Sequence, residues 1–148
     1  MADIRHRVGI AAPQSRVYEA LATTEGLSRW WTRDLDGDPE QGGTLRFFFG
    51  GAGPGAVMDV VNTTPPSHVG WHCADGPEEW VGTNLSFDLS PSGGETVVVF
   101  THGDWRQPVE FMHHCSTKWA YFLLGMKAGL EGGKATACPG DMKISSWG

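Results

Sequence analysis

The sequence predicts an α+β protein in which one curved antiparallel β-sheet of about six strands wraps around a long C-terminal α-helix. Three observations predict this fold. The first segment alternates like a strand and is followed by two short helical patterns, five further strand-like segments are separated by Gly- and Pro-rich turns, and the last apolar residues recur at helical spacing. With 148 residues, 40% of them hydrophobic, the chain suits one domain spanning residues 1–148.

The N-terminal part predicts a strand and two helices. Residues 4–10 alternate between two faces, one of them mostly apolar, as in a strand with one buried side. Pro13 is suited to the first position of a helix, and Thr24 is placed to cap a second, shorter one. This second helix delivers the pair Trp30 and Trp31.

The middle of the chain predicts a meander of strands. Residues 32–43, rich in Asp, Glu and Gly, are predicted to form an acidic loop. Short connections at 50–55 and 90–94 favour antiparallel pairing. The expected strands are residues 44–49, 56–62, 68–73, 81–89 and 95–102. Because residues 97–100 are apolar on both faces, the last strand is expected to be central.

The C-terminal part predicts a helix of roughly 25 residues, from Val109 to the glycine pair Gly132 and Gly133. A helix of this length crosses a whole small sheet. Its apolar residues fall on a single face: Met112, Cys115, Trp119, Phe122, Leu123, Met126 and Leu130.

Composition excludes several classes of function. The net charge is -6 and the eleven Lys and Arg residues are scattered, so nucleic acid is not an expected partner. No apolar run has signal-peptide or membrane-spanning length, which predicts a cytoplasmic protein without membrane insertion. The three cysteines lack CxxC spacing and are expected to be free thiols.

No metal and no cofactor are expected. In the acidic loop, Pro39 stands where a calcium loop needs its glycine, and Leu45 stands where it needs its terminal glutamate. His113, His114 and Cys115 are consecutive in a helix, so their side chains diverge by about 100° each and cannot meet at one ion.

A series of motifs in a fixed order resembles a known family. The motifs are Val17-Tyr18-Glu19-Ala20-Leu21, Trp30-Trp31, Gly42-Gly43-Thr44-Leu45-Arg46-Phe47, Trp71, Gly82-Thr83, Thr101-His102-Gly103, and Trp119 with Leu123. They cover nearly the whole chain. In this order they resemble the START-like (SRPBCC) superfamily and, within it, the group related to the heat-shock chaperone ATPase activator.

This resemblance implies a helix-grip fold with a deep, mostly apolar cavity between sheet and C-terminal helix. Members bind lipids, sterols, hormones or polyketides, and a minority catalyse reactions on such ligands. Nothing in the chain matches the separate chaperone-binding domain of a eukaryotic co-chaperone activator, so a chaperone association is not supported. The fold by itself does not decide the function.

We therefore expect a lipid- or polyketide-like hydrophobic or aromatic ligand, held by the inward-facing residues of strands and helix. Any single aromatic residue fits a core position better than a ligand site, and only the whole set indicates a cavity. The expected ligand-binding residues are Trp30, Trp31, Phe47, Phe49, Met58, Trp71, Cys73, Thr83, Leu85, Phe87, Phe100, His102, Met112, Cys115, Trp119, Phe122 and Leu123.

Two alternatives stay open beside a binding protein. As a cyclase- or hydrolase-like enzyme, the chain would use His102 as a general base with Asp104 or Glu110, or Cys115 as a nucleophile. The competing interpretation is that His102 is a histidine at a strand end, held by backbone groups, and that Cys115 acts as a small buried apolar residue. We favour this interpretation and therefore a protein without enzymatic activity.

As an interaction module, the chain would use surface tryptophans. Trp80, Trp105 and Trp147 fall at loop-like or terminal positions, and the last two would serve as anchors. An apolar strand edge or Trp147 is also compatible with a homodimer.

Overall fold

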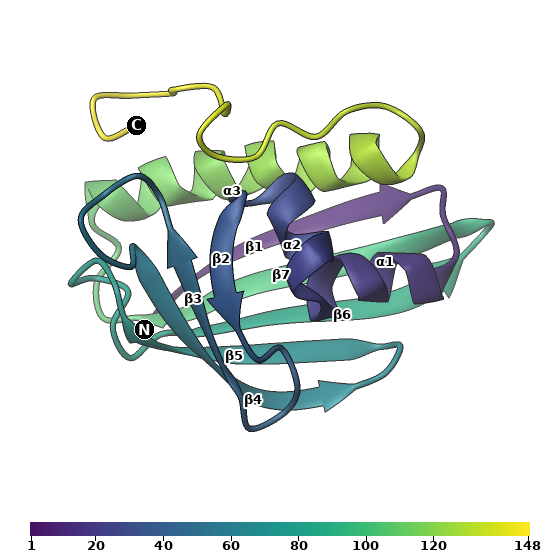
Figure 1. Cartoon of the computed structure of the whole chain (residues 1–148), viewed down its shortest axis with the longest axis horizontal. Helices are drawn as coiled ribbons and strands as arrows, with labels where there is room; N and C mark the ends of the chain where they lie inside the picture. The colour runs from purple at the N-terminus through teal and green to yellow at the C-terminus, as the bar shows by residue number, and fades with distance from the viewer.

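The computed structural model describes residues 1–148 and has the predicted α+β helix-grip arrangement (Figure 1). One antiparallel seven-stranded sheet has the order β1-β7-β6-β5-β4-β3-β2. The long helix α3 lies across the curved sheet, and α1 and α2 pack beside it. The elements are β1 (Ala2–Ile10), α1 (Gln14–Ala22), α2 (Thr24–Trp30), β2 (Asp34–Gly37), β3 (Thr44–Phe48), β4 (Ala56–Thr64), β5 (His68–Asp75), β6 (Asn84–Ser92), β7 (Glu95–Trp105) and α3 (Glu110–Leu130).

The strand β2 is the one element that sequence analysis missed, and it raises the number of strands to seven. It lies inside the expected acidic loop and pairs with β3, where Asp36 faces Arg46. The Arg46 Nε donates to Asp36 Oδ1 over 2.7 Å. The strand was missed because only Leu35 is even half-buried, so the sequence has no alternation of apolar and polar residues. Its acidic side chains suit a sheet edge that is protected from pairing with other chains.

The boundaries of β6 and β7 also differ from the prediction. β6 begins at Asn84 because residues 77–83 form a turn, in which the Thr83 hydroxyl donates to the Trp80 carbonyl. β7 continues to Trp105, which is only 1% exposed. The expectation that Trp105 lies at the surface was therefore wrong. β7 lies between β1 and β6, as its two apolar faces predicted.

The helix α3 has 21 residues and ends at the predicted glycine pair. Gly132 has a φ of 94°, the left-handed conformation that favours glycine. The Gly133 N–H donates to the Ala128 carbonyl over 2.8 Å, which closes the last turn as in a Schellman motif. Six of the seven stripe residues are buried, and Leu130 is half-buried.

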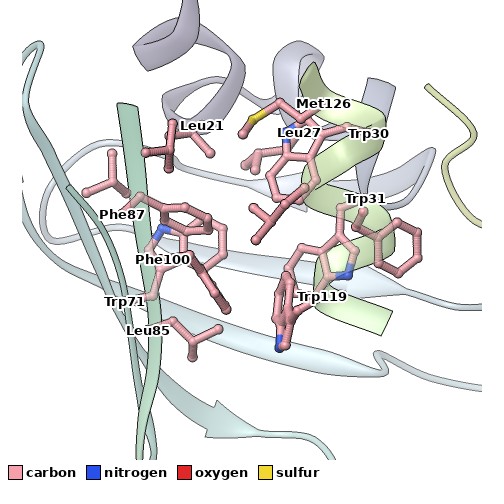
Figure 2. Close-up of a cluster of buried hydrophobic side chains, with 14 of the residues drawn as sticks. Leu21, Leu27, Trp30, Trp31, Trp71, Leu85, Phe87, Phe100, Trp119 and Met126 are labelled. Atoms are coloured by element: carbon pink, nitrogen blue, oxygen red, sulfur yellow. The ribbon is translucent and has the colours of Figure 1, made fainter. Parts of the chain in front are cut away.

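The aromatic residues of sheet and helices pack mainly against one another (Figure 2). Trp31 lies at the centre, with ring centroids 4.3 Å from Phe47, 4.9 Å from Trp119 and 6.0 Å from Trp71. The buried Trp30 indole donates to the Ala20 carbonyl over 2.9 Å. The space that a deep cavity would occupy is thus largely filled by these rings.

No helix in the structure has both the length and the apolar character needed to cross a membrane. Cys73, Cys115 and Cys138 are all buried free thiols.

Candidate functional site

A cavity of about 370 Å³ opens beside the N-terminal half of α3. The helix forms one wall, and the loop after β3, the turn after β5 and the C-terminal segment form the others. Aromatic side chains dominate the interior, and the charged groups come from α3 and the C-terminal segment. The lining residues are Trp31, Phe49, Gly55, Pro77, Trp80, Phe111, His114, Cys115, Lys118, Trp119, Phe122, Cys138, Asp141, Lys143, Trp147 and Gly148.

Three of the four tryptophans that line this cavity pack against one another. Trp119 belongs to the buried stripe of α3, and its ring stacks on Trp80 with centroids 6.0 Å apart and planes at 17°. Trp31 follows α2 and also contacts Trp119, with ring centroids 4.9 Å apart. The turn that carries Trp80 is held by Arg106, whose guanidinium donates to the carbonyls of Val81 and Glu78 over 2.7 and 2.6 Å. Fixed flat surfaces of this kind suit a ring-containing ligand.

Five of the expected ligand-binding residues line this cavity: Trp31, Phe49, Cys115, Trp119 and Phe122. Trp30 lines a different cleft, between α1, α2 and the end of α3. The others pack within the core and do not line the cavity, because neighbouring side chains fill the space beside them. They are Phe47, Met58, Trp71, Cys73, Thr83, Leu85, Phe87, Phe100, His102, Met112 and Leu123.

Sequence analysis missed three residues of α3 that lie beside the buried stripe. Phe111, His114 and Lys118 recur every three or four residues, and all three line the cavity together with Phe122 of the buried stripe. This spacing was available in the sequence. The contributions of Trp80 and of the C-terminal segment could not be predicted from the sequence, because no local pattern shows where a turn or a terminal segment folds back.

His102 is fully buried in a chain of hydrogen bonds that fixes its tautomer. The Trp119 indole can only donate, so His102 Nδ1 accepts from it over 3.2 Å. His102 Nε2 therefore carries the proton and donates to the Thr83 hydroxyl over 2.8 Å. Burial lowers the pKa of His102 to about 3, so the ring is neutral at pH 7.

This arrangement argues against the catalytic role considered for His102. A general base needs a free lone pair, and the one on Nδ1 is engaged by Trp119. Asp104, the expected orienting carboxylate, accepts from the Asn84 side-chain amide over 2.8 Å instead. Glu110 is exposed at the start of α3. Sequence spacing placed Asp104 near His102, but alternate residues of a strand share a face only while the strand is regular, and Asp104 has a φ of 68°.

Cys115 lies in the cavity wall as an unreactive thiol. Burial raises its pKa to about 12. No thiolate is thus available near neutral pH. Buried cysteine of this kind acts as a small apolar side chain.

The second cleft is larger, about 560 Å³, but it suits an apolar ligand less well. Arg16, Arg29, Arg33 and Lys134 surround it. Arg29 and Arg33 lie near the C-terminal end of α2 and Lys134 follows that of α3, where the helix dipole favours positive charge, whereas Arg16 belongs to the first turn of α1. We therefore take the smaller, indole-walled cavity as the candidate site.

Comparison with known proteins relates the whole fold to one family. The model of the activator of Hsp90 ATPase homolog 1-like family matches residues 11–131. The Aha1 dimer from Colwellia psychrerythraea, solved in solution, is similar with a TM-score of 0.82 and 42% sequence identity, over 91% of this chain and 100% of that one. No curated protein matches the chain.

Two more distant structures share the fold alone. SSP2350 from Staphylococcus saprophyticus has a TM-score of 0.77 at 21% identity, over 93% of this chain and 98% of that one. CalU16 from Micromonospora echinospora has a TM-score of 0.73 at 20% identity, over 90% of this chain and 76% of that one.

The family match spans most of the chain, and the structure has the sheet, the two short helices and the long final helix that the motif order implied. The resemblance inferred from the motifs is thereby confirmed. The chain belongs to the activator of Hsp90 ATPase homolog 1-like family, within the START-like (SRPBCC) superfamily.

Proposed function

We propose that the protein binds a hydrophobic small molecule with an aromatic or polyketide-like ring system in the cavity beside α3. The observation that carries this proposal is the set of three indoles, Trp31, Trp80 and Trp119, that face one cavity. Its volume of about 370 Å³ falls within the range of roughly 300–1,000 Å³ common to small-molecule sites. A flat ring placed against these indoles gains both apolar burial and favourable stacking.

A binding role suits the site better than catalysis. The ionisable groups that face the cavity are already engaged: Lys118 with Asp141, and His114 with Ser145. Burial keeps the Cys115 thiol protonated and His102 neutral. The two residues that the sequence offered as base and nucleophile are therefore not poised to exchange protons with a ligand.

The test is a thermal-shift screen with lipids, flavonoids and polyketide-like aromatics, accompanied by native mass spectrometry of freshly purified protein. A true ligand present at a hundredfold excess over its Kd adds about 2.7 kcal/mol, or roughly 5–10 °C in Tm.

A cavity-filling variant gives the specificity control. Cys115→Phe places a ring in the cavity and should abolish the shift, whereas Thr117→Phe, at an exposed position of the same helix outside the cavity, should keep it. If no compound shifts the wild type and the native mass is that of the bare chain, the proposal fails.

We also propose that the protein forms a homodimer. The relative that is 42% identical was solved as a dimer. Three of the exposed large apolar side chains, Leu124, Met142 and Trp147, lie on α3 and on the segment that covers it. Their burial between two copies would remove apolar surface from water.

A second candidate function is an effect on a heat-shock chaperone, favoured by the description of the family. Of its two proposed anchors, Trp105 is buried and Trp147 is 53% exposed. The test is whether the purified protein raises the ATPase rate of Hsp90, and whether Trp147→Ala removes that effect. An unchanged rate with the wild-type protein rejects this function.

A further inference from the structure

The C-terminal segment, residues 137–148, forms one wall of the candidate site. Figure 1 shows it running back over α3, from the end of the helix towards its start. Cys138, Asp141, Lys143, Trp147 and Gly148 line the cavity. The family match ends at residue 131, so this wall is built by a part of the chain outside the match.

The backbone of this segment is anchored at a single point. The Cys138 N–H donates to the Trp31 carbonyl over 2.9 Å, and the Arg33 N–H donates to the Cys138 carbonyl over 3.0 Å. Beyond Cys138, the segment's backbone–backbone hydrogen bonds stay within it, as between Ile144 and Gly148. Residues 139–148 are therefore attached to the rest of the molecule through side chains.

Lys118 of α3 makes most of these attachments. Its Nζ lies 2.5 Å from Asp141 Oδ2 and donates to the carbonyls of Met142 and Gly148 over 2.5 and 2.9 Å. The Lys118 side chain is 15% exposed and that of Asp141 only 4%. Removing Lys118 leaves the buried Asp141 carboxylate with only the exposed Lys143, whose Nζ lies 3.5 Å from Asp141 Oδ1, and removing Asp141 takes the carboxylate from Lys118. Both changes are unfavourable because they weaken the pairing of a buried charge.

The remaining attachments are weaker because they lie closer to solvent. The Met142 N–H donates to the Tyr121 hydroxyl over 3.1 Å, and the Ser145 hydroxyl pairs with His114 Nδ1 over 2.6 Å. Trp147 packs edge-on against Phe111 and is half-exposed. Within one chain, Lys118 thus holds a segment whose other contacts lie at the surface.

We propose that residues 139–148 are a hinged cover of the cavity, anchored at Cys138 and latched by Lys118, and that opening of this cover controls entry to the site. The inference rests on the proposed function for the meaning of the cavity. A ligand that enters past the cover replaces the contacts that Trp147 makes with the cavity wall by contacts of its own. The same opening exposes Cys115, which lies in the cavity and is 4% exposed in the closed form.

The first experiment measures the motion of the segment in the full chain. Lys118→Met keeps the apolar stem and removes the charge and the donors, and Asp141→Asn breaks the same latch from the other side. Lys134→Met is the matched control, because Lys134 is exposed and lies outside the cavity. Peptide-resolved hydrogen exchange should become about tenfold faster in residues 139–148 of the two latch variants, with the sheet unchanged.

The second experiment measures access to the cavity without any ligand. Alkylation of each cysteine by iodoacetamide is followed by peptide mass spectrometry. In both latch variants Cys115 should react about tenfold faster, while Cys73, buried in the sheet and away from the cavity, keeps its rate. Losing the cation of Lys118 does not favour the thiolate, so faster alkylation in that variant reports access.

The outcomes separate the two proposals. Unchanged exchange in residues 139–148 overturns the latch, and faster exchange with unchanged alkylation of Cys115 overturns the cover. If both rates rise but no compound of the ligand panel slows the alkylation of Cys115, the cover stands and the proposed ligand binding fails.

Discussion

At the scale of single residues, His102 illustrates how a polar side chain is kept in an aromatic core. It lies among the rings of Trp80, Trp105 and Trp119, with centroids 4.9, 4.9 and 6.1 Å away. Because both ring nitrogens are hydrogen-bonded, burying the polar imidazole costs little free energy. The indole N–H groups of Trp80 and Trp105 have no such partner, and each raises the cost of folding. The hydrogen-bond chain through His102 is therefore a structural device that depends on a neutral ring.

The protonation of His102 should make stability depend on pH. In the unfolded chain His102 takes up a proton below its ordinary pKa of 6.5, whereas burial lowers its pKa in the fold to about 3. Stability is therefore full above pH 6.5 and falls as the pH decreases towards 3. Between pH 7 and pH 5 the loss from this group is about 2 kcal/mol.

Urea denaturation of the wild type and of His102→Gln at the two pH values measures this loss. Glutamine offers the same acceptor and donor to Trp119 and Thr83 without titrating. The variant should lose about 2 kcal/mol less than the wild type between pH 7 and pH 5. Equal losses would show that His102 is not held neutral.

At the scale of elements, close approach decides which residues the helices tolerate. In α2, a Cβ added at Gly26 would lie 2.5 Å from the Glu19 carbonyl oxygen of α1 and 2.6 Å from the Ala20 Cα. These are backbone atoms, which cannot turn aside as a flexible side chain does. In α3, a Cβ at Gly125 would meet its nearest neighbour, Ala135, at 3.8 Å, an ordinary contact. The two helices thus place opposite demands on their glycines.

Replacing each glycine by alanine tests this difference. Alanine favours a helix over glycine by about 1 kcal/mol, so Gly125→Ala should stabilise the protein by roughly 0.5–1 kcal/mol. Gly26→Ala should instead destabilise it by about 1–3 kcal/mol, because α1 and α2 must move apart. Thermal or urea unfolding gives both values. A stabilising effect at Gly26 would mean that the helices are not packed this closely.

At the scale of the whole molecule, the sheet and α3 form the core, and the C-terminal segment completes the wall of the candidate site. The sheet and α3 bury a continuous aromatic core, and the indole-walled cavity opens beside the first half of α3. The C-terminal segment then closes part of that opening and adds apolar side chains to the outer surface. The proposed self-association through this surface requires the folded molecule and depends on protein concentration.

The proposed dimer predicts a defined response to charge on this surface. Sedimentation at micromolar concentration should give the mass of two chains for the wild type. The double variant Leu124→Glu, Met142→Glu should give one chain, because four like charges would meet in the interface. Val61→Glu, at a 49% exposed position on β4, is the control and should remain dimeric. A wild type that sediments as one chain refutes the dimer.

The sequence by itself determined the order of elements, the buried stripe of α3 and its glycine stop. These depend on periodicity and on backbone preferences, which are local and can be read from neighbouring residues. It also determined that aromatic rings face inward, as Trp71, Phe87 and Phe100 do. It missed β2 because an exposed edge strand has no apolar period.

Only the tertiary structure decided which inward residues meet a cavity and which meet each other. Phe47 and Trp31 have the same character in the sequence, yet Trp31 lines the site and Phe47 does not. Likewise, only the tertiary structure buries Trp105 and makes Lys118 the latch of a segment distant in the sequence. The physical reason is that a cavity is the space left after all side chains have packed, so its walls depend on contacts between residues far apart in the chain.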